Sequence, residues 1–250
     1  MLTKDLAICI RAVDYSETSQ VVTLFTRATG KIGAIAKGTK RPKSAFDGPI
    51  EIFSYGKIVF SDSNREKLAT LTEFESACGE PGFIALHNSL FVLNCCLFAA
   101  ELLDKLTHEY DPHAELFDSF LQFLKNAQES KNNRQMLALL IWFQLGLLKE
   151  VGLQPILSCC ANCKTSHEPR ATSHEIYFSN SANGLICRDC EASFPDRIGL
   201  TKNAARGLSD VKKIANSDNE TLNEIEKILI HHFTELLGRP PKMARHILES

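Results

Sequence analysis

Two pairs of cysteines with the same internal spacing constrain this chain more than any other feature of its sequence. Cys160 and Cys163 form one C-x-x-C pair, and Cys187 and Cys190 form the second. A C-x-x-C turn can direct two sulfurs to one metal ion, and a loop of about twenty residues lets the second turn come back to face the first. Four cysteine ligands fill every position of a tetrahedral zinc ion and leave none for water. The spacing therefore predicts one Zn²⁺ site with a structural rather than a catalytic role.

Other ligand sets are compatible with the same segment. Cys159 directly precedes the first pair, and His167 and His174 lie in the loop. A shifted register, or a site with three cysteines and one histidine, is therefore an alternative. A redox pair is a further alternative, although neither pair follows a strand in a βαβ pattern. Matching pairs give matching turns, which favours Cys160 over Cys159.

The composition indicates a globular protein of the cytoplasm. The 250 residues are 44% hydrophobic, and 28 basic residues are nearly balanced by 30 acidic ones. The nine cysteines are an odd number, and the first residues show no export signal, so we expect reduced thiols rather than a disulfide framework. The most apolar stretches, residues 83–100 and 136–148, are interrupted by polar residues or too short to cross a bilayer. Any contact with nucleic acid must come from a local basic patch, because the net charge is not basic.

The first 80 residues have the pattern of short β-strands. Leu6, Ile8 and Ile10 alternate with other residues in the first of them. Further runs rich in β-branched and aromatic residues follow at residues 21–26, 31–36, 50–60 and 68–74. Five short strands predict a small closed or nearly closed barrel, because closure removes exposed sheet edges.

The pattern becomes helical after residue 80. Apolar residues recur at helical spacing up to about His108, again after Asp111-Pro112, and again from Asn132, which can cap a helix ending near Gly152. The cysteine-rich segment interrupts this region before the helical spacing resumes. We therefore expect an α+β multidomain protein with a barrel at 1–80, a first helical part at 81–154, a zinc-binding insertion at 155–196 and a second helical part at 197–250.

A run of positive charge lies within the predicted barrel. Between positions 27 and 46 there are no acidic residues, and the basic ones are Arg27, Lys31, Lys37, Lys40, Arg41 and Lys43. A flexible loop of cations beside a β-barrel can follow a phosphate backbone. A solvated loop with no ligand is the alternative from charge alone. The chain has no P-loop, no G-x-S-x-G elbow and no H-E-x-x-H motif, so we do not expect an enzyme.

Three separated blocks of the sequence resemble those of the RecO family of bacterial recombination mediators. The first block contains DYSET, F-T-R-x-x-G and KG-x-x-RPKS, the second is VGLQPILSCCANC, and the third is FSNSANGLICRDC. The resemblance covers most of the chain, with the blocks in order. The family often has glycine after the first C-x-x-C and two glycines before the second, where this chain has Lys164 and Asn183-Gly184. Asparagine tolerates left-handed backbone well, so the second difference is mild.

The resemblance implies an N-terminal OB-fold that binds single- and double-stranded DNA, and a helical domain that carries a four-cysteine zinc module. It implies zinc ligation by Cys160, Cys163, Cys187 and Cys190. It implies DNA contact by the basic segment, whose residues and sequence neighbours are Arg11, Arg27, Lys31, Lys37, Lys40, Arg41 and Lys43.

The activity that the resemblance implies is non-enzymatic. Members of the family are expected to work with RecR, and in many organisms with RecF, to load RecA onto DNA coated by single-stranded DNA-binding protein, and to anneal complementary strands. Docking of the tail of single-stranded DNA-binding protein on the helical domain is also implied. Such a protein is cytoplasmic and associates with the nucleoid when it acts.

Two other classes of protein fit the residues. In a protein-interaction adaptor, the basic loop would be exposed to solvent and would bind no DNA. A zinc-ribbon transcription factor would instead prefer particular duplex sequences. For the DNA-binding class, bases stacked on exposed aromatics of the barrel would add roughly 1 to 3 kcal/mol each. The sequence does not say which aromatic side chains face outward, and the candidates are Phe25, Phe46, Phe53, Tyr55, Phe60 and Phe74.

Overall fold

The computed structural model describes residues 2–41, 46, 48–61, 68–76, 83–166 and 176–248. Two compact units form within the chain. The first comprises Met1–Leu90 and Ala100–Gln128, and the second comprises Phe91–Ala99 and Glu129–Ser250. The first unit thus combines the predicted barrel with a helix that the sequence-based segments place in the helical domain. Within the described residues, no helix is both long and apolar enough to span a membrane.

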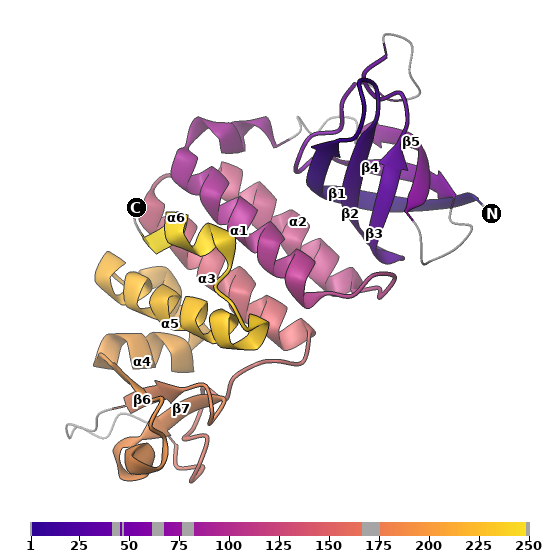
Figure 1. Cartoon of the computed structure of the whole chain (residues 1–250). Coiled ribbons are helices and arrows are strands. Elements are labelled where there is room, and N and C mark those ends of the chain that lie inside the picture. Colours follow the sequence, from indigo (N-terminus) through magenta and orange to yellow (C-terminus); the bar gives the residue numbers. More distant parts are fainter. Residues whose placement is uncertain are drawn as a thin grey trace. The chain divides into compact units, whose positions relative to one another are not determined.

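Five strands in the first unit close into a barrel, as the sequence predicts (Figure 1). They are β1 (Leu2–Asp14), β2 (Gln20–Thr26), β3 (Gly30–Ala36), β4 (Tyr55–Ser61) and β5 (Ala69–Ser76). Their order around the barrel is β1-β2-β3-β5-β4, and only the β3–β5 pair is parallel. This arrangement is an OB-type barrel.

Alternate residues of each strand fill the barrel interior. Ala7 and Cys9 of β1, and Val22 and Leu24 of β2, are fully buried in one cluster with inward residues of the other strands. Strand alternation therefore places the intervening residues on the outer face. Many of these are also buried, because helix α2 (Ala114–Gln128) covers part of that face.

Aromatic rings join α2 to the outer face of the barrel. The Phe25 and Phe117 ring centroids lie 5.9 Å apart, and those of Tyr55 and Phe117 lie 6.4 Å apart. The Phe53 and Phe120 centroids lie 6.5 Å apart. The apolar stripe predicted for this helix is therefore buried against the barrel of its own unit.

A β-bulge in β1 divides the outer face into a covered half and an exposed half. The pairing of β1 with β2 shifts register between Cys9 and Arg11. Before the bulge Ile8 is fully buried, whereas after it Arg11 is exposed and Val13 is 46% exposed. A bulge bends a strand and re-aims its side chains. The outer face of β1 is therefore exposed from Arg11 to the end of the strand at Asp14, next to the loop that follows.

Helices dominate the second unit, apart from the cysteine-rich segment. They are α3 (Asn133–Glu150), α4 (Lys202–Ser209), α5 (Asn219–Leu237) and α6 (Arg245–Leu248), with 3₁₀ turns at Val211–Asn216 and Lys242–Ala244. Helix α1 (Leu90–Leu106) contributes Phe91–Ala99 to this unit, and the 3₁₀ turn Ile84–Asn88 belongs to the first unit. Helix α3 packs on α5, and both have largely apolar buried faces.

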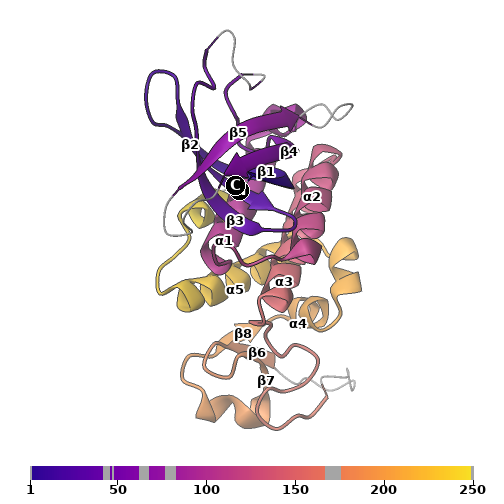
Figure 2. The ribbon, with the colours of Figure 1, turned by 90° about the vertical axis from the view of Figure 1, so that its right-hand side faces the viewer.

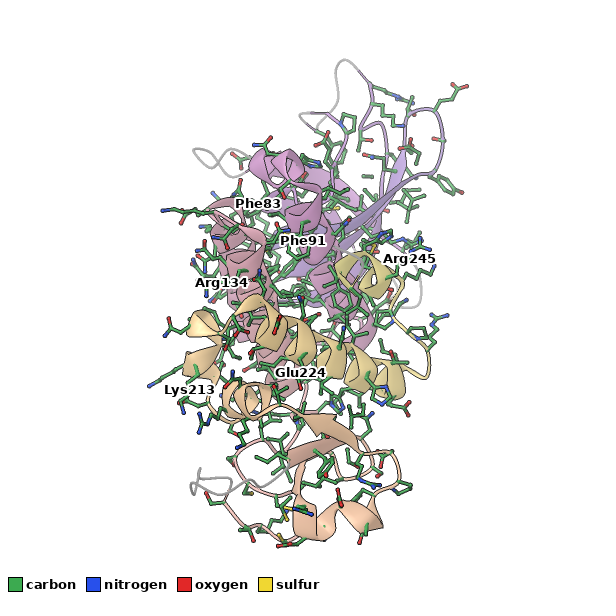
Figure 3. The ribbon with its side chains drawn as sticks, turned by 90° about the vertical axis from the view of Figure 1, so that its left-hand side faces the viewer. Phe83, Phe91, Arg134, Lys213, Glu224 and Arg245 are labelled. Atoms are coloured by element: carbon green, nitrogen blue, oxygen red, sulfur yellow. The ribbon has the colours of Figure 1, made fainter. Side chains whose placement is uncertain are left out.

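Polar caps set the helix ends in this unit. The Asn132 side chain accepts a hydrogen bond from the Gln135 backbone N–H at 2.9 Å, which confirms the cap that the sequence predicts for α3. Glu224 of α5 is labelled in Figure 3. Its carboxylate accepts hydrogen bonds from the Thr201 N–H at 2.7 Å and from the Thr201 hydroxyl at 2.5 Å. Because Thr201 caps α4, this contact fixes the start of α4 against α5.

The cysteine-rich segment forms a small sheet. Its strands β6 (Ile176–Ser179), β7 (Gly184–Cys187) and β8 (Ile198–Leu200) pair in the order β7-β6-β8 (Figure 2). A 3₁₀ turn at Arg188–Ser193 follows β7 and contains Cys190. Ile156, just before the first cysteine pair, pairs with Gly184 at the edge of β7. A Cβ atom on Gly184 would lie 2.2 Å from the Ile156 carbonyl oxygen, so only glycine permits this approach.

Candidate nucleic-acid interface and metal site

The structure brings the two cysteine pairs together. The sulfurs of Cys160, Cys163, Cys187 and Cys190 all lie within 4.8 Å of one another, and the Cys163 and Cys187 sulfurs are 3.7 Å apart. A tetrahedral ion with metal–sulfur bonds of about 2.3 Å holds its sulfurs about 3.8 Å apart. The donor set and its spacing therefore fit one tetrahedral metal ion. Cys159 pairs with Ser166 beside this group, and His167 and His174 lie outside the described residues.

The first cysteine pair sits on a tight turn that its backbone hydrogen bonds define. The Lys164 N–H donates to the Cys160 carbonyl at 2.9 Å, and the Cys160 N–H donates to the Thr165 carbonyl at 2.9 Å. Lys164 has a φ of 62°, in the left-handed region that favours glycine. Lys164 thus occupies a backbone position that is strained for a residue with a side chain.

Hydrogen bonds from one cysteine turn also reach the sulfurs of the other. The Cys187 N–H donates to the Cys160 sulfur at 3.4 Å, and the Asn162 side-chain amide donates to the Cys190 sulfur at 3.3 Å. Donors of this kind stabilise thiolates rather than thiols. They also orient metal ligands, as polar groups around a bound ion commonly do.

Four thiolates in this space need a cation. Hydrogen bonds from Thr165 lower the pKa of Cys163 to about 6, whereas burial first, and then the neighbouring sulfurs, raise the pKa of Cys187 to about 12. Without a cation, the cluster therefore favours a thiolate at Cys163 beside a protonated thiol at Cys187. A bound divalent metal stabilises all the thiolates together and displaces their protons.

Contacts with α5 hold this module within the second unit. Nδ1 of the buried His232 lies 2.8 Å from Oδ1 of Asn180, which directly follows β6. Burial lowers the pKa of His232 to about 4, so the ring is neutral at pH 7 and Nδ1–H donates to the amide oxygen.

Asp196 accepts hydrogen bonds from the Ser179 hydroxyl at 2.9 Å and from the Ser181 hydroxyl at 2.6 Å. These bonds tie the chain before and after β7 together.

The structure separates the predicted DNA-contacting residues into two groups at opposite ends of the β2–β3 hairpin. Arg27 and Lys31 lie at the end where the two strands are joined by a turn. Lys37, Lys40 and Arg41 follow β3 at the other end. Strands of seven residues span about 20 Å. Residues close in sequence are thus far apart on the barrel.

The charges of Arg27 and Lys31 are already paired within the first unit. The Arg27 guanidinium makes two hydrogen bonds to the Asp118 carboxylate, at 2.9 and 2.8 Å, and thereby lowers the pKa of Asp118. Lys31 is 7% exposed, and its ammonium donates to the carbonyls of Asp104 and Thr107 and lies 3.3 Å from the Asp104 carboxylate. Lys31 is therefore not positioned to meet a phosphate, contrary to the expectation from its place in the basic segment.

The other end of the hairpin presents exposed cations. Lys37, Lys40 and Arg41 are exposed, and Lys40 also pairs with Asp14, with 2.6 Å between Nζ and the carboxylate oxygen. Arg11 is exposed on the outer face of β1, after the bulge. Lys43 lies outside the described residues. Among the predicted DNA-contacting residues that the structure describes, Arg11, Lys37, Lys40 and Arg41 thus lie where β1 and β3 end.

The aromatic residues of the strands do not form a stacking surface. Phe25, Phe53 and Phe60 are at most 1% exposed, and Phe46 and Phe74 are at most 7% exposed. The half-buried Tyr55 ring packs on Phe117. None of the six aromatic residues named from the sequence therefore offers an open ring face for a base. Sequence reasoning missed one exposed aromatic, Tyr15, which is 68% exposed in the loop after β1. Its place inside a turn-forming cluster was the available indication.

An OB-type barrel with exposed cations, joined in one chain to a helical unit with a cysteine cluster, is typical of nucleic-acid-binding proteins. Comparison with known families makes this specific. Residues 1–78 match the model described as "Recombination protein O N terminal", and residues 87–245 match "Recombination protein O C terminal".

Similar proteins match nearly the whole chain. The DNA repair protein RecO of Bacillus subtilis (strain 168) is 32% identical over 254 residues, which is 99% of this chain and 94% of that protein. The DNA repair protein RecO of Bacillus pumilus (strain SAFR-032) is 31% identical over 245 residues, which is 95% of this chain and 90% of that protein. The chain belongs to the RecO family of DNA repair and recombination proteins.

Proposed function

We propose that this protein is a recombination mediator that binds DNA at the basic end of its barrel and anneals complementary strands. The observation that carries the proposal is the cluster of exposed cations where β1 and β3 end, on an OB-type barrel of a RecO-family chain. Such a cluster binds phosphates without reading sequence, which suits a protein that must act on any strand.

The proposed DNA surface comprises Arg11, Lys37, Lys40, Arg41 and Lys43. The opposite end of the β2–β3 hairpin is a poor competitor, because it gathers acidic groups around its two cations. Asp118 pairs with Arg27, Asp104 pairs with Lys31, and the Asp5 carboxylate accepts hydrogen bonds from the backbone of the adjoining turn. Both single- and double-stranded DNA present the phosphates that the basic end requires.

Protein partners complete the proposed activity. As in the family it belongs to, the chain would work with RecR, and with RecF where present, to load RecA onto DNA coated by single-stranded DNA-binding protein, whose tail would dock on the helical domain. The protein would catalyse no bond chemistry and would act in the bacterial cytoplasm, at the nucleoid.

The metal of the cysteine cluster is proposed to be one Zn²⁺ ion held by Cys160, Cys163, Cys187 and Cys190. Zinc suits four thiolates in a tetrahedron and has no redox chemistry of its own. The ion would stabilise the β6–β8 module and thereby the partner-binding unit. Its loss would reach DNA binding by the barrel only indirectly.

An annealing assay tests the proposed function. Two complementary DNA strands, one carrying a fluorophore and the other a quencher, are mixed with the protein, first bare and then coated with single-stranded DNA-binding protein. We expect faster annealing than the spontaneous rate in both cases, with weaker acceleration at high salt. No acceleration on either kind of strand would refute the proposal.

A further inference from the structure

Tyr15 is the most exposed aromatic side chain that the structure describes in the barrel. Its side chain is 68% exposed, although a ring of this size usually packs against other residues. It lies in the loop between β1 and β2, at residues 15–19. Tyr15 and Ser16 both donate backbone hydrogen bonds to the Ser19 carbonyl, at 2.9 and 3.3 Å. The loop is therefore a closed turn that presents the ring from a defined backbone.

Two contacts attach this loop to the basic turn that follows β3. The Lys40 N–H donates to the Thr18 carbonyl at 3.4 Å, and the Lys40 ammonium lies 2.6 Å from the Asp14 carboxylate. Gly38 has a φ of 79°, in the left-handed region that favours glycine. The chain therefore turns sharply at Gly38, within the basic turn formed by residues 37–41. Tyr15 thus directly follows Asp14, which contacts Lys40 of the basic turn.

The exposed strip of the sheet leads to the same ring. Arg11, Val13 and Tyr15 are alternate residues, and each of them is exposed. Val13 pairs with the half-buried Val21 of β2, which pairs in turn with the half-buried Ile35 of β3. A partly apolar outer face therefore lies between one exposed guanidinium and one exposed aromatic ring, with the basic turn at its edge.

We infer that Tyr15 stacks on an unpaired base of single-stranded DNA while the neighbouring cations hold the phosphates. This inference rests on the proposed function and adds a second kind of contact to it. Every base has an aromatic face, so stacking needs no particular sequence. A base stacked on one ring keeps its hydrogen-bonding edge open, which is what a strand needs in order to meet its complement.

The charge around the ring supports a nucleic acid rather than an apolar partner. Lys37 and Arg41 are exposed cations beside the loop, and Asp14 already neutralises part of the charge of Lys40. Glu17 is an exposed acid in the loop itself. A strand that brings both phosphates and bases matches an aromatic ring set among cations, whereas a purely apolar partner would leave these cations desolvated.

Two DNA strands of equal length separate base contacts from phosphate contacts. One is an oligomer of thymidylates, and the other has the same phosphates but abasic sugars. Binding of both is measured by fluorescence anisotropy for the full-length wild type, Tyr15→Ala and Tyr15→Phe. Leu2→Ala is the matched control, because Leu2 is a 63% exposed apolar residue at the opposite end of β1.

We expect Tyr15→Ala to weaken binding of the thymidylate strand at least about fivefold and to leave binding of the abasic strand within about twofold. Tyr15→Phe and Leu2→Ala should bind both strands as the wild type does. An equal loss on both strands, or no loss on the thymidylate strand, would overturn the stacking role and leave the proposed DNA binding intact. Failure of the wild type to bind either strand would instead overturn the proposed function and the stacking role together.

Discussion

A carboxyl group buried between α3 and α5 should make the protein less stable as the pH rises. Glu226 is 1% exposed, and its Oε1 accepts a hydrogen bond from the Gln144 side-chain amide at 2.8 Å. Burial raises the pKa of Glu226 from 4.5 to about 8, although the bond from Gln144 acts in the opposite direction. The folded protein therefore holds this carboxyl protonated at pH 7, whereas the unfolded chain releases the proton.

The sign and size of the effect follow from the two pKa values. The folded-state pKa of Glu226 is the higher one, so the unfolded state loses its proton first as the pH rises from 4.5 to about 8. The stability that burial of the protonated carboxyl permits is fully present below the unfolded-state pKa of Glu226. It is lost progressively as the pH rises toward the folded-state pKa. Between pH 5 and pH 8 the loss approaches about 4 kcal/mol, since each of the three pH units in this window is worth up to about 1.4 kcal/mol.

Glu226→Gln removes the titrating group and keeps an oxygen that can accept from Gln144. We expect the variant to be more stable than the wild type by about 2 to 4 kcal/mol at pH 8 and nearly equal to it at pH 5. Urea unfolding at both pH values measures the difference. Glu235→Gln is the matched control, because Glu235 is an exposed residue of the same helix. A variant that is less stable at pH 8, or that differs from the wild type equally at both pH values, would refute the reasoning.

Three further substitutions test local geometry. Lys164→Gly should stabilise the metal module by up to about 1 kcal/mol, because glycine adopts the left-handed backbone without strain; thermal unfolding of the metal-loaded protein measures it. Gly184→Ala should destabilise the module by about 2 kcal/mol or more, because the added Cβ would meet the Ile156 carbonyl, and the metal content of the purified protein should fall. Asp14→Asn should strengthen binding of single-stranded DNA up to about fivefold, because an exposed ion pair with Lys40 no longer competes with phosphate; weaker binding would show that the pair positions Lys40 instead.

The barrel and the cysteine cluster were predictable because local patterns determine them. Strand alternation identifies β1 to β3 without any knowledge of their neighbours, and C-x-x-C spacing brings sulfurs together through short turns. The cap at Asn132 is equally local. Such features depend on residues a few positions apart, which a single sequence displays directly.

The DNA surface was harder to predict because it depends on which end of a strand a residue occupies. Lys31 belongs to the same charged run as Lys37, but one strand of the barrel separates them, and only Lys31 meets Asp104. The apolar stripe of α2 predicts that one face of the helix is buried, but it does not say what that face packs against. The sequence therefore could not show that α2 covers Phe25. Tyr15 lies in a loop, where no strand alternation indicates which way its ring faces.

The salt dependence of single-stranded DNA binding tests most directly the claim that the cations where β1 and β3 end hold DNA. The slope of log affinity against log salt is compared for the wild type, a triple variant with Lys37, Lys40 and Arg41 all changed to glutamine, and the control Arg27→Gln. The triple variant should lower the magnitude of the slope by about 2, since each phosphate contact on a single strand contributes about 0.7, whereas Arg27→Gln should leave the slope unchanged. A slope that falls for Arg27→Gln but not for the triple variant would place the DNA at the other end of the barrel and contradict the account.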